Sequence, residues 1–197
     1  MFVVYKMSSS RSGMATAKTG SFYLTETVTL PSGSISGSRV SGTIDLGAYV
    51  NVATGQAIAI DSVDFVYQTG SDFGSDGLSM LAANGAISAQ LVDLNPGTAF
   101  VRADNQSLIA SGSLNVDVPN NILSHATDIY PDNYGTAGSL SEMFMVVNDT
   151  LYLTSGPDGA PIGPNGVYVT ARIRARVVKL GSKDWMALAL QSTASDN

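Results

Sequence analysis

Apolar and polar residues alternate without exception over residues 167–177. Every odd position there is Val, Ala or Ile, whereas every even position is Tyr, Thr or Arg. A period of two predicts a long strand that is buried on one side only. The outward face of this strand carries three arginines in succession, Arg172, Arg174 and Arg176. Such a strand belongs in a large sandwich and gives it a basic stripe.

The same period recurs along the rest of the chain. It predicts strands over residues 22–30, 42–50 and 108–118, with shorter strands at 87–94, 99–103, 146–153 and 185–191. The last of these is apolar on both faces, so we expect it to be covered on both. Within residues 57–68 the apolar positions change from even to odd, which predicts a bulge near Asp61 and Ser62.

Two short helical segments interrupt this pattern. Asp76 is placed to cap a helix that ends at Asn84 and Gly85. Ser139 and Glu142 have the spacing of a capping box before residues 143–147, which predicts a single helical turn there. No long amphipathic helix is predicted, so the eight to ten strands must pack on one another as two antiparallel sheets.

The predicted fold class is therefore all-β, a two-sheet antiparallel sandwich. A chain of 197 residues with long strands and long loops favours a jelly roll of about eight strands over the smaller immunoglobulin type. Residues 1–20 are rich in Ser and Gly and are predicted to form an N-terminal arm, and residues 21–197 a single jelly-roll domain. The arm begins with four apolar residues, Phe2, Val3, Val4 and Tyr5.

Charge is sparse for a soluble domain. Charged residues make up 13% of the chain and hydrophobic residues 44%, whereas about a quarter of an average domain is charged. This favours a surface that is covered by partners, although a Ser/Thr/Gly-rich extracellular β domain has a similar composition. No apolar run is long enough for a membrane helix, and residues 1–7 lack the features of a signal peptide, so we expect no transmembrane segment.

The net charge of −6 is unevenly distributed. Residues 19–171 contain two basic and fourteen acidic residues, a net −12, whereas residues 1–18 and 172–197 each carry +3. The basic residues of the arm are Lys6, Arg11 and Lys18. This charge is far below that of a dense nucleic-acid-binding arm, so we expect nucleic-acid contact through the termini to be weak at most.

Little in the sequence points to catalysis. The absence of cysteine excludes disulfides, thiolate catalysis and cysteine-based zinc sites. His125 is the only histidine, and we expect it to be structural or incidental. A hydrolase with paired carboxylates, for example Glu26 and Glu142, stays open as an alternative. We therefore expect that the protein is not an enzyme and that it binds no cofactor, with calcium as the one candidate left open.

Two oxygen-rich clusters are candidate calcium sites, because calcium prefers oxygen ligands. The first holds Asp72 and Asp76, and the second Asp128 and Asp132. Neither has the spacing of an EF-hand loop. For a carbohydrate-binding surface the candidates are Tyr49, Tyr130 and Tyr134, whereas Trp185 is expected to belong to the core.

The whole chain resembles the single jelly-roll capsid proteins of icosahedral viruses. The resemblance is architectural, with no specific motif, and is carried by four features: the Ser/Gly-rich arm with its basic residues, at least eight strands between residues 22 and 191, long loops such as residues 155–166, and low charge. It implies two facing four-stranded sheets, an arm that runs along the shell interior or into a neighbour, and loops that decorate the exterior.

The leading hypothesis is therefore a structural capsid protein of the virion, which self-assembles into an icosahedral shell with copies of itself and with any other coat proteins. Interface or genome-facing candidates are Phe2, Val3, Val4, Tyr5, Lys6, Arg11, Lys18, Arg172, Arg174 and Arg176. The first alternative is an extracellular carbohydrate-binding or adhesin-type module, and the second is a lone-domain hydrolase.

Overall fold

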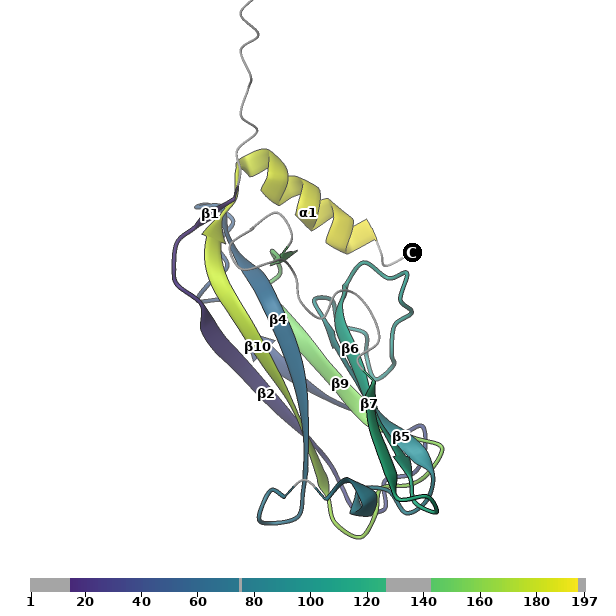
Figure 1. The fold of residues 1–197 in the computed structure, drawn as a ribbon. Coiled ribbons are helices and arrows are strands. Elements are labelled where there is room, and N and C mark those ends of the chain that lie inside the picture. The colour runs from purple at the N-terminus through teal and green to yellow at the C-terminus, as the bar shows by residue number, and fades with distance from the viewer. Residues whose placement is uncertain (1–14, 75, 127–142, 195–197) are drawn as a thin grey trace, which may run out of the picture.

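The computed structural model describes residues 15–74, 76–126 and 143–194, and side chains through Leu190. These residues form two antiparallel β-sheets that face each other, with one α-helix across one end of the sandwich (Figure 1). The core between the sheets is made almost entirely of aliphatic side chains from the inward faces of the strands.

The first sheet is built around its longest strands. β1 and β2 both pair with β10, β10 pairs with β4, and β4 pairs with β8. The bounds are β1 (Thr16–Ala17), β2 (Phe22–Leu30), β4 (Gln56–Thr69), β8 (Phe144–Val146) and β10 (Val167–Lys179). The strict alternation in β10 matches its position, because its apolar face is buried and its polar face points away from the core.

The second sheet has the order β3-β9-β5-β6-β7. Its strands are β3 (Val40–Asp45), β5 (Gly85–Val92), β6 (Leu108–Asp117), β7 (Ile122–Ala126) and β9 (Thr150–Asp158). Four strands of each sheet, β2-β10-β4-β8 and β3-β9-β5-β6, follow the jelly-roll order, in which the chain crosses repeatedly between facing sheets. The predicted fold class is confirmed.

The change of apolar phase in β4 comes from a bulge, as predicted. Ser62 pairs with Arg174 and Ile60 pairs with Ala175, so Asp61 has no partner of its own on β10. One extra residue reverses which side of the strand each later residue faces. Apolar side chains consequently point into the core on both sides of the bulge.

Residues 185–191 do not form the predicted closing strand. They belong to α1 (Ser182–Ala194). A short apolar run without alternation fits either a strand or a helix. Here Asp184 lies in the first turn of α1, where a carboxylate is favourable. The predicted covering on both faces is also wrong, because Met186 and Leu190 are exposed.

Four smaller predictions need correction. The helix predicted over residues 76–85 is only the 3₁₀-helix η1 (Gly77–Ser79). Residues 99–103 are not a strand, because the backbone of Val101 pairs with the Gln90 side chain instead. The strand predicted over 42–50 ends at Asp45, whose carboxylate accepts from Gly47 N in a turn.

The strand predicted over residues 146–153 is divided between β8 and β9, which lie in different sheets. A turn at Asn148 and Asp149 separates the two strands. Ser139 and Glu142, the expected capping box, lie outside the described residues.

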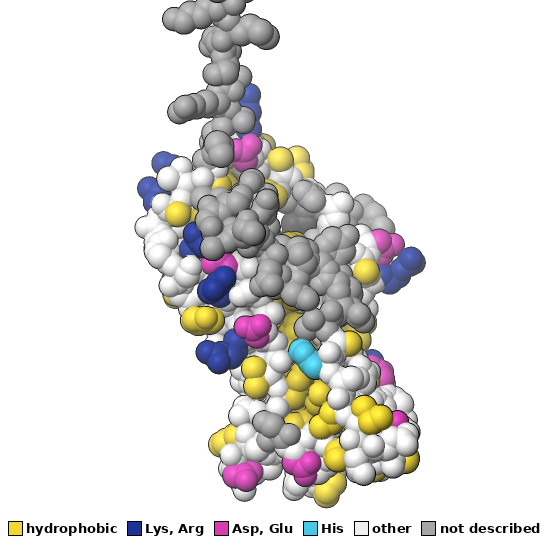
Figure 2. Space-filling model, viewed as in Figure 1, with side chains coloured by type: hydrophobic (Ala, Val, Ile, Leu, Met, Phe, Trp, Pro, Cys, Tyr) yellow, Lys and Arg dark blue, Asp and Glu magenta, His cyan; other side chains and the backbone are white. Residues whose placement is uncertain are grey.

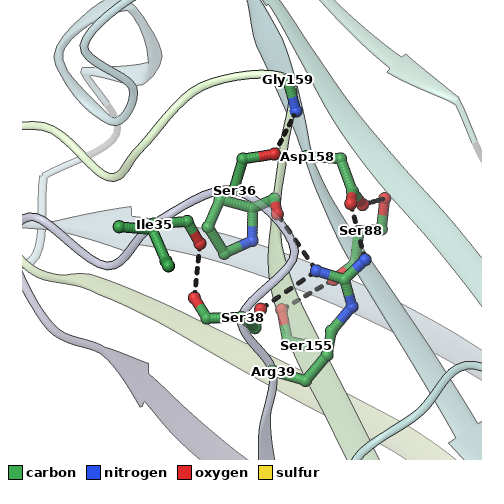
Figure 3. A network of polar contacts seen from close by, with 9 residues as sticks. Ile35, Ser36, Ser38, Arg39, Ser88, Ser155, Asp158 and Gly159 are labelled. Atoms are coloured by element: carbon green, nitrogen blue, oxygen red, sulfur yellow. Dashed lines mark hydrogen bonds and ion pairs between the residues drawn. The ribbon is translucent and has the colours of Figure 1, made fainter.

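Arg39 joins the β2–β3 loop to the end of β9 (Figure 3). Its Nη2 donates to Asp158 at 2.6 Å, and its Nη1 donates to the carbonyls of Ser38 and Pro157, both at 3.0 Å. The guanidinium also lies 4.3 Å from the centre of the Phe100 ring. This side chain is 13% exposed, so it is largely buried with its charge paired.

Candidate functional site

The arginine stripe lies on the outward face of β10, and two of its members are held by one carboxylate. Asp61 Oδ1 and Oδ2 accept from Arg176 Nη2 at 3.1 and 3.0 Å, and Arg174 Nε lies 3.6 Å from Oδ2. Ser21 Oγ donates to the same carboxylate at 3.1 Å. Asp61 is 3% exposed, so this is a buried anion with two cations beside it.

Arg172 has a different environment. Its guanidinium lies 5.5 Å from the centre of the Tyr23 ring, and the residue is exposed. On β4 its cross-strand neighbour is Asp64, which is also exposed. Of the three arginines in the stripe, Arg172 is therefore the one without an ion pair to Asp61.

The start of the described chain lies beside this cluster. Lys18 N donates to Val177 O at 2.8 Å, and Val177 N donates to Thr19 Oγ1 at 3.0 Å. Lys18 is exposed. The remaining arm candidates lie outside the described residues: Phe2, Val3, Val4, Tyr5, Lys6 and Arg11.

The calcium candidates do not form a cation cage in the described part of the chain. Asp72 Oδ1 accepts from Gly74 N at 3.4 Å within a turn. Asp76 precedes η1, and its backbone carbonyl accepts from Ser79. No group of three or more His, Cys, Asp or Glu side chains suited to a metal ion occurs among the described residues. Asp128 and Asp132 lie outside them.

An apolar groove opens where β4 faces β7. It encloses about 260 Å³. Its lining consists of Phe65, Val66, Tyr67, Gly77, Met80, Leu114, Leu123 and His125. Figure 2 shows hydrophobic side chains gathered beside His125 on this side of the sandwich. The sequence pattern predicted strands for Phe65, Tyr67 and Leu114 but none for residues 122–126, so it did not indicate that Leu123 and His125 of β7 would line the same groove.

Tyr67 and His125 meet in this groove. Their rings lie 5.8 Å apart in an edge-to-face arrangement, which gives His125 a packing contact. The Tyr67 hydroxyl is buried and has no hydrogen-bond partner among the described residues. Burial raises the pKa of Tyr67 well above its usual value, because the phenolate would lose its hydration.

A second pocket lies between α1 and the β3–β4 turn. It encloses about 640 Å³, and Val52, Leu180, Trp185 and Met186 are part of its lining. Trp185 is half-buried against the core, in the helix and not in a strand. Val52 and Met186 are 67% and 62% exposed, so the rim of this pocket presents apolar surface.

Two residues of the alternative hypotheses have defined environments. Glu26 points between the sheets at a half-buried position, and desolvation raises its pKa. Glu142, its suggested partner, lies outside the described residues. Tyr49 stacks on Phe22 with ring centres 5.2 Å apart and packs against the core. Tyr130 and Tyr134 are not among the described residues.

Comparison with known proteins adds no family to this description. No protein-family model and no curated protein sequence matches the chain. Among the described residues, no helix has the length and apolar character required to cross a bilayer.

Proposed function

We propose that this chain is a structural capsid protein, which self-assembles into an icosahedral shell of a virion through the sides of its jelly roll and through its N-terminal arm. Its activity would be association with copies of itself and with any other coat proteins. The observation that carries the proposal is the number of large apolar side chains exposed on a jelly roll of low charge.

These side chains lie on the outward face of β2, in loops, on β7 and on α1. Between 42% and 71% of each is exposed. They are Tyr23, Ile35, Val52, Phe73, Ile122, Leu123, Met186 and Leu190. Exposed apolar surface of this kind marks interaction sites, and charged residues are depleted at the centre of protein interfaces.

The charge arrangement favours protein contacts over genome contacts. Arg174 and Arg176 form ion pairs with Asp61, which leaves less positive charge for phosphate groups. Salt-sensitive binding to nucleic acid needs many unpaired cations. We therefore infer that burial of apolar surface drives assembly and that nucleic-acid contact at the basic termini is weak.

The test is the mass of the full chain by light scattering, followed by negative-stain imaging. Closed shells, pentamers or hexamers are expected. Met186→Glu should reduce assembly because it puts a charge on the exposed apolar rim, whereas Ser182→Glu, with the same charge on an already polar position of α1, should not. A chain that stays monomeric at high concentration in physiological salt overturns the proposal.

A second candidate, a carbohydrate-binding or adhesin-type module, is favoured by one observation. The rings of Phe73 and Tyr168 lie 5.3 Å apart, and Phe73 is 55% exposed, which gives an aromatic surface on which a sugar ring can stack. A glycan array is the direct test. Binding that is lost in Phe73→Ala but kept in Tyr23→Ala would support this candidate, and an array without binding would remove it.

A further inference from the structure

The strand register defines two opposite ends of the sandwich. Leu30 of β2 and Thr69 of β4 both pair with Val167 at the start of β10. Gln56 of β4 pairs with Lys179 at the other end of β10, where α1 follows (Figure 1). We name these the loop end and the helix end. The loop end comprises residues 31–39, 70–74, 76–84, 117–122 and 158–166, and the helix end comprises residues 15–19, 46–55 and 179–190.

Exposed apolar side chains occur at both ends. Eight large apolar side chains are exposed in the described part of the chain, and each end carries three of them. Those at the loop end are Ile35, Phe73 and Ile122, and those at the helix end are Val52, Met186 and Leu190. All six are more than half exposed. Each end therefore presents apolar surface that a partner protein could cover.

Hydrogen bonds between its loops brace the loop end. Gly33 N in the β2–β3 loop donates to Ile162 O in the β9–β10 loop at 3.1 Å. Gly163 N in the β9–β10 loop donates to Met80 O, in the connection between β4 and β5, at 2.9 Å. Val118 N, in the β6–β7 turn, donates to an asparagine side chain of the same connection at 2.9 Å. Loops held in this way have less conformational freedom to lose when a partner binds.

The loop end is acidic. Its charged residues are Arg39, Asp72, Asp76, Asp117 and Asp158, a net charge of −3 from one basic and four acidic residues. Arg39 pairs with Asp158. The other three aspartates form no ion pair within the described part of the chain. A partner that complements this end has apolar side chains together with positive charge.

The helix end has that character. Its charged residues are Lys18, Lys179, Lys183 and Asp184, a net charge of +2 from three lysines and one aspartate, and all four are exposed. Lys179 lines the same pocket as Val52 and Met186, so positive charge lies directly beside the apolar rim. The exposed carboxylates of Asp45 and Asp149 belong to the second sheet, at the ends of β3 and β9, and not to the segments around α1.

We propose that the helix end of one copy of this chain binds the loop end of another copy, in a head-to-tail contact. This inference rests on the proposed self-assembly and adds a contact to those made by the sides of the jelly roll and by the arm. The two ends match in both respects, because each offers three apolar side chains and their net charges are opposite. Either end placed against itself would bring like charges together.

A head-to-tail contact determines which assemblies can form. It uses two different surfaces of each copy, so every copy that has bound at one end can still bind at the other. The contact closes into a ring when the rotation between successive copies divides a full turn, and otherwise it continues as a filament. It therefore provides a route to the pentamers or hexamers expected of a shell.

Two variants of the full chain, each with one end blocked, test the contact. Met186→Glu puts a carboxylate on the helix end, where it would face the aspartates, and Ile35→Arg puts a cation on the loop end, where it would face the lysines. Each variant keeps the opposite end intact. A mixture of the two should therefore form a heterodimer and stop there. Both positions are exposed, so the fold should be unchanged, which circular dichroism checks.

Sedimentation velocity with differently labelled copies measures the outcome. The heterodimer should dissociate with a Kd at least about tenfold below that for self-association of either variant, because the blocked ends would have to bury an unpaired charge. The matched controls are Thr25→Glu and Thr25→Arg, which place the same charges on the outward face of β2, opposite Arg172 and away from both ends. Each control alone should assemble as the unmodified chain does.

The opposite charges predict that salt weakens the heterodimer. Raising the ionic strength from about 0.05 M to about 0.5 M should raise its Kd about threefold or more. Asp72→Asn in the Met186→Glu copy should also raise the Kd at low salt, and asparagine keeps the oxygen that accepts from Gly74 N in the turn. Asp104→Asn in the same copy should have no effect, since Asp104 lies outside the loop end and pairs with Arg102.

The possible results separate the two proposals. If the unmodified chain assembles but the mixture forms no more dimer than either blocked variant alone, the head-to-tail contact is overturned and self-assembly stands. A blocked variant that dimerises alone as tightly as the mixture also overturns the contact, because like ends would then be binding each other. A heterodimer that responds neither to salt nor to Asp72→Asn overturns the pairing by charge. An unmodified chain that stays monomeric at high concentration overturns both proposals.

Discussion

Asp61 accepts hydrogen bonds from Arg176 Nη2 through both carboxylate oxygens, at 3.1 and 3.0 Å. The bulge in β4 makes this contact possible, because the inserted residue leaves the normal alternation and can meet the outward face of β10. The same carboxylate accepts from Ser21, so one residue connects β4, β10 and the segment before β2. The basic stripe is thereby partly neutralised within the chain.

Asp61→Asn should destabilise the fold by about 2–4 kcal/mol, because it leaves the mostly buried Arg176 without its anion. Urea unfolding followed by Trp185 fluorescence measures the change. Asp104→Asn is the control, since Asp104 pairs with Arg102 at an exposed position and its removal should change stability by about 0.5 kcal/mol or less. Equal effects of the two substitutions would show that the Asp61 cluster is not a stabilising contact.

Glu26→Gln should raise the melting temperature at about pH 7 and have little effect at about pH 3. Burial raises the pKa of Glu26 above its usual 4.5, so the folded state binds the proton more tightly than the unfolded state. Stability attributable to Glu26 is therefore greatest at low pH and falls as the pH rises from 4.5 through the folded-state pKa. Thermal unfolding across this range measures it, with Asp104→Asn as the control. A Glu26→Gln effect that does not vary with pH would contradict the assignment.

Arg39→Lys should cost about 1–2 kcal/mol although it keeps the charge. A lysine cannot donate to Asp158 and to two carbonyls from one planar group, nor stack in the same way on Phe100. Chemical denaturation measures the loss. Arg102→Lys, at an exposed ion pair, should be close to neutral. If Arg39→Lys leaves the free energy of unfolding unchanged, the hydrogen-bond geometry of the network in Figure 3 contributes little to stability beyond the positive charge.

Tyr67→Phe should leave stability unchanged or increase it by about 1 kcal/mol, because it removes a buried hydroxyl for which the described part of the chain provides no hydrogen-bond partner. The edge contact with His125 does not need the hydroxyl and should persist. Differential scanning calorimetry measures the change. Tyr67→Leu serves as the comparison and should be destabilising, because it removes ring volume from the core. A clear loss of stability in Tyr67→Phe would mean that the hydroxyl is satisfied.

Where alternation was strict, the sequence was sufficient to predict the local structure. The positions of β2, β6 and β10 and the bulge at Asp61 all follow from a period of two, since a one-residue slip would put apolar side chains in water. The strand predicted over residues 42–50 ends at Asp45, because a turn follows. The residues of that turn continue the alternation of apolar and polar positions, so the pattern overestimated the length of the strand. An apolar run without alternation was ambiguous, and residues 185–191 proved to be helical.

The sequence by itself indicated an all-β fold of antiparallel strands packed face to face, because many one-sided strands without a long helix can bury their apolar faces only against one another. It also determined the basic stripe on one strand face and the apolar start of the arm. Only the tertiary structure decided that Asp61 neutralises part of the stripe, that β8 pairs with residues 58–60 of β4, and that Tyr67 meets His125. Those relationships join residues distant in the chain, and a periodic pattern contains information only about neighbours along one strand.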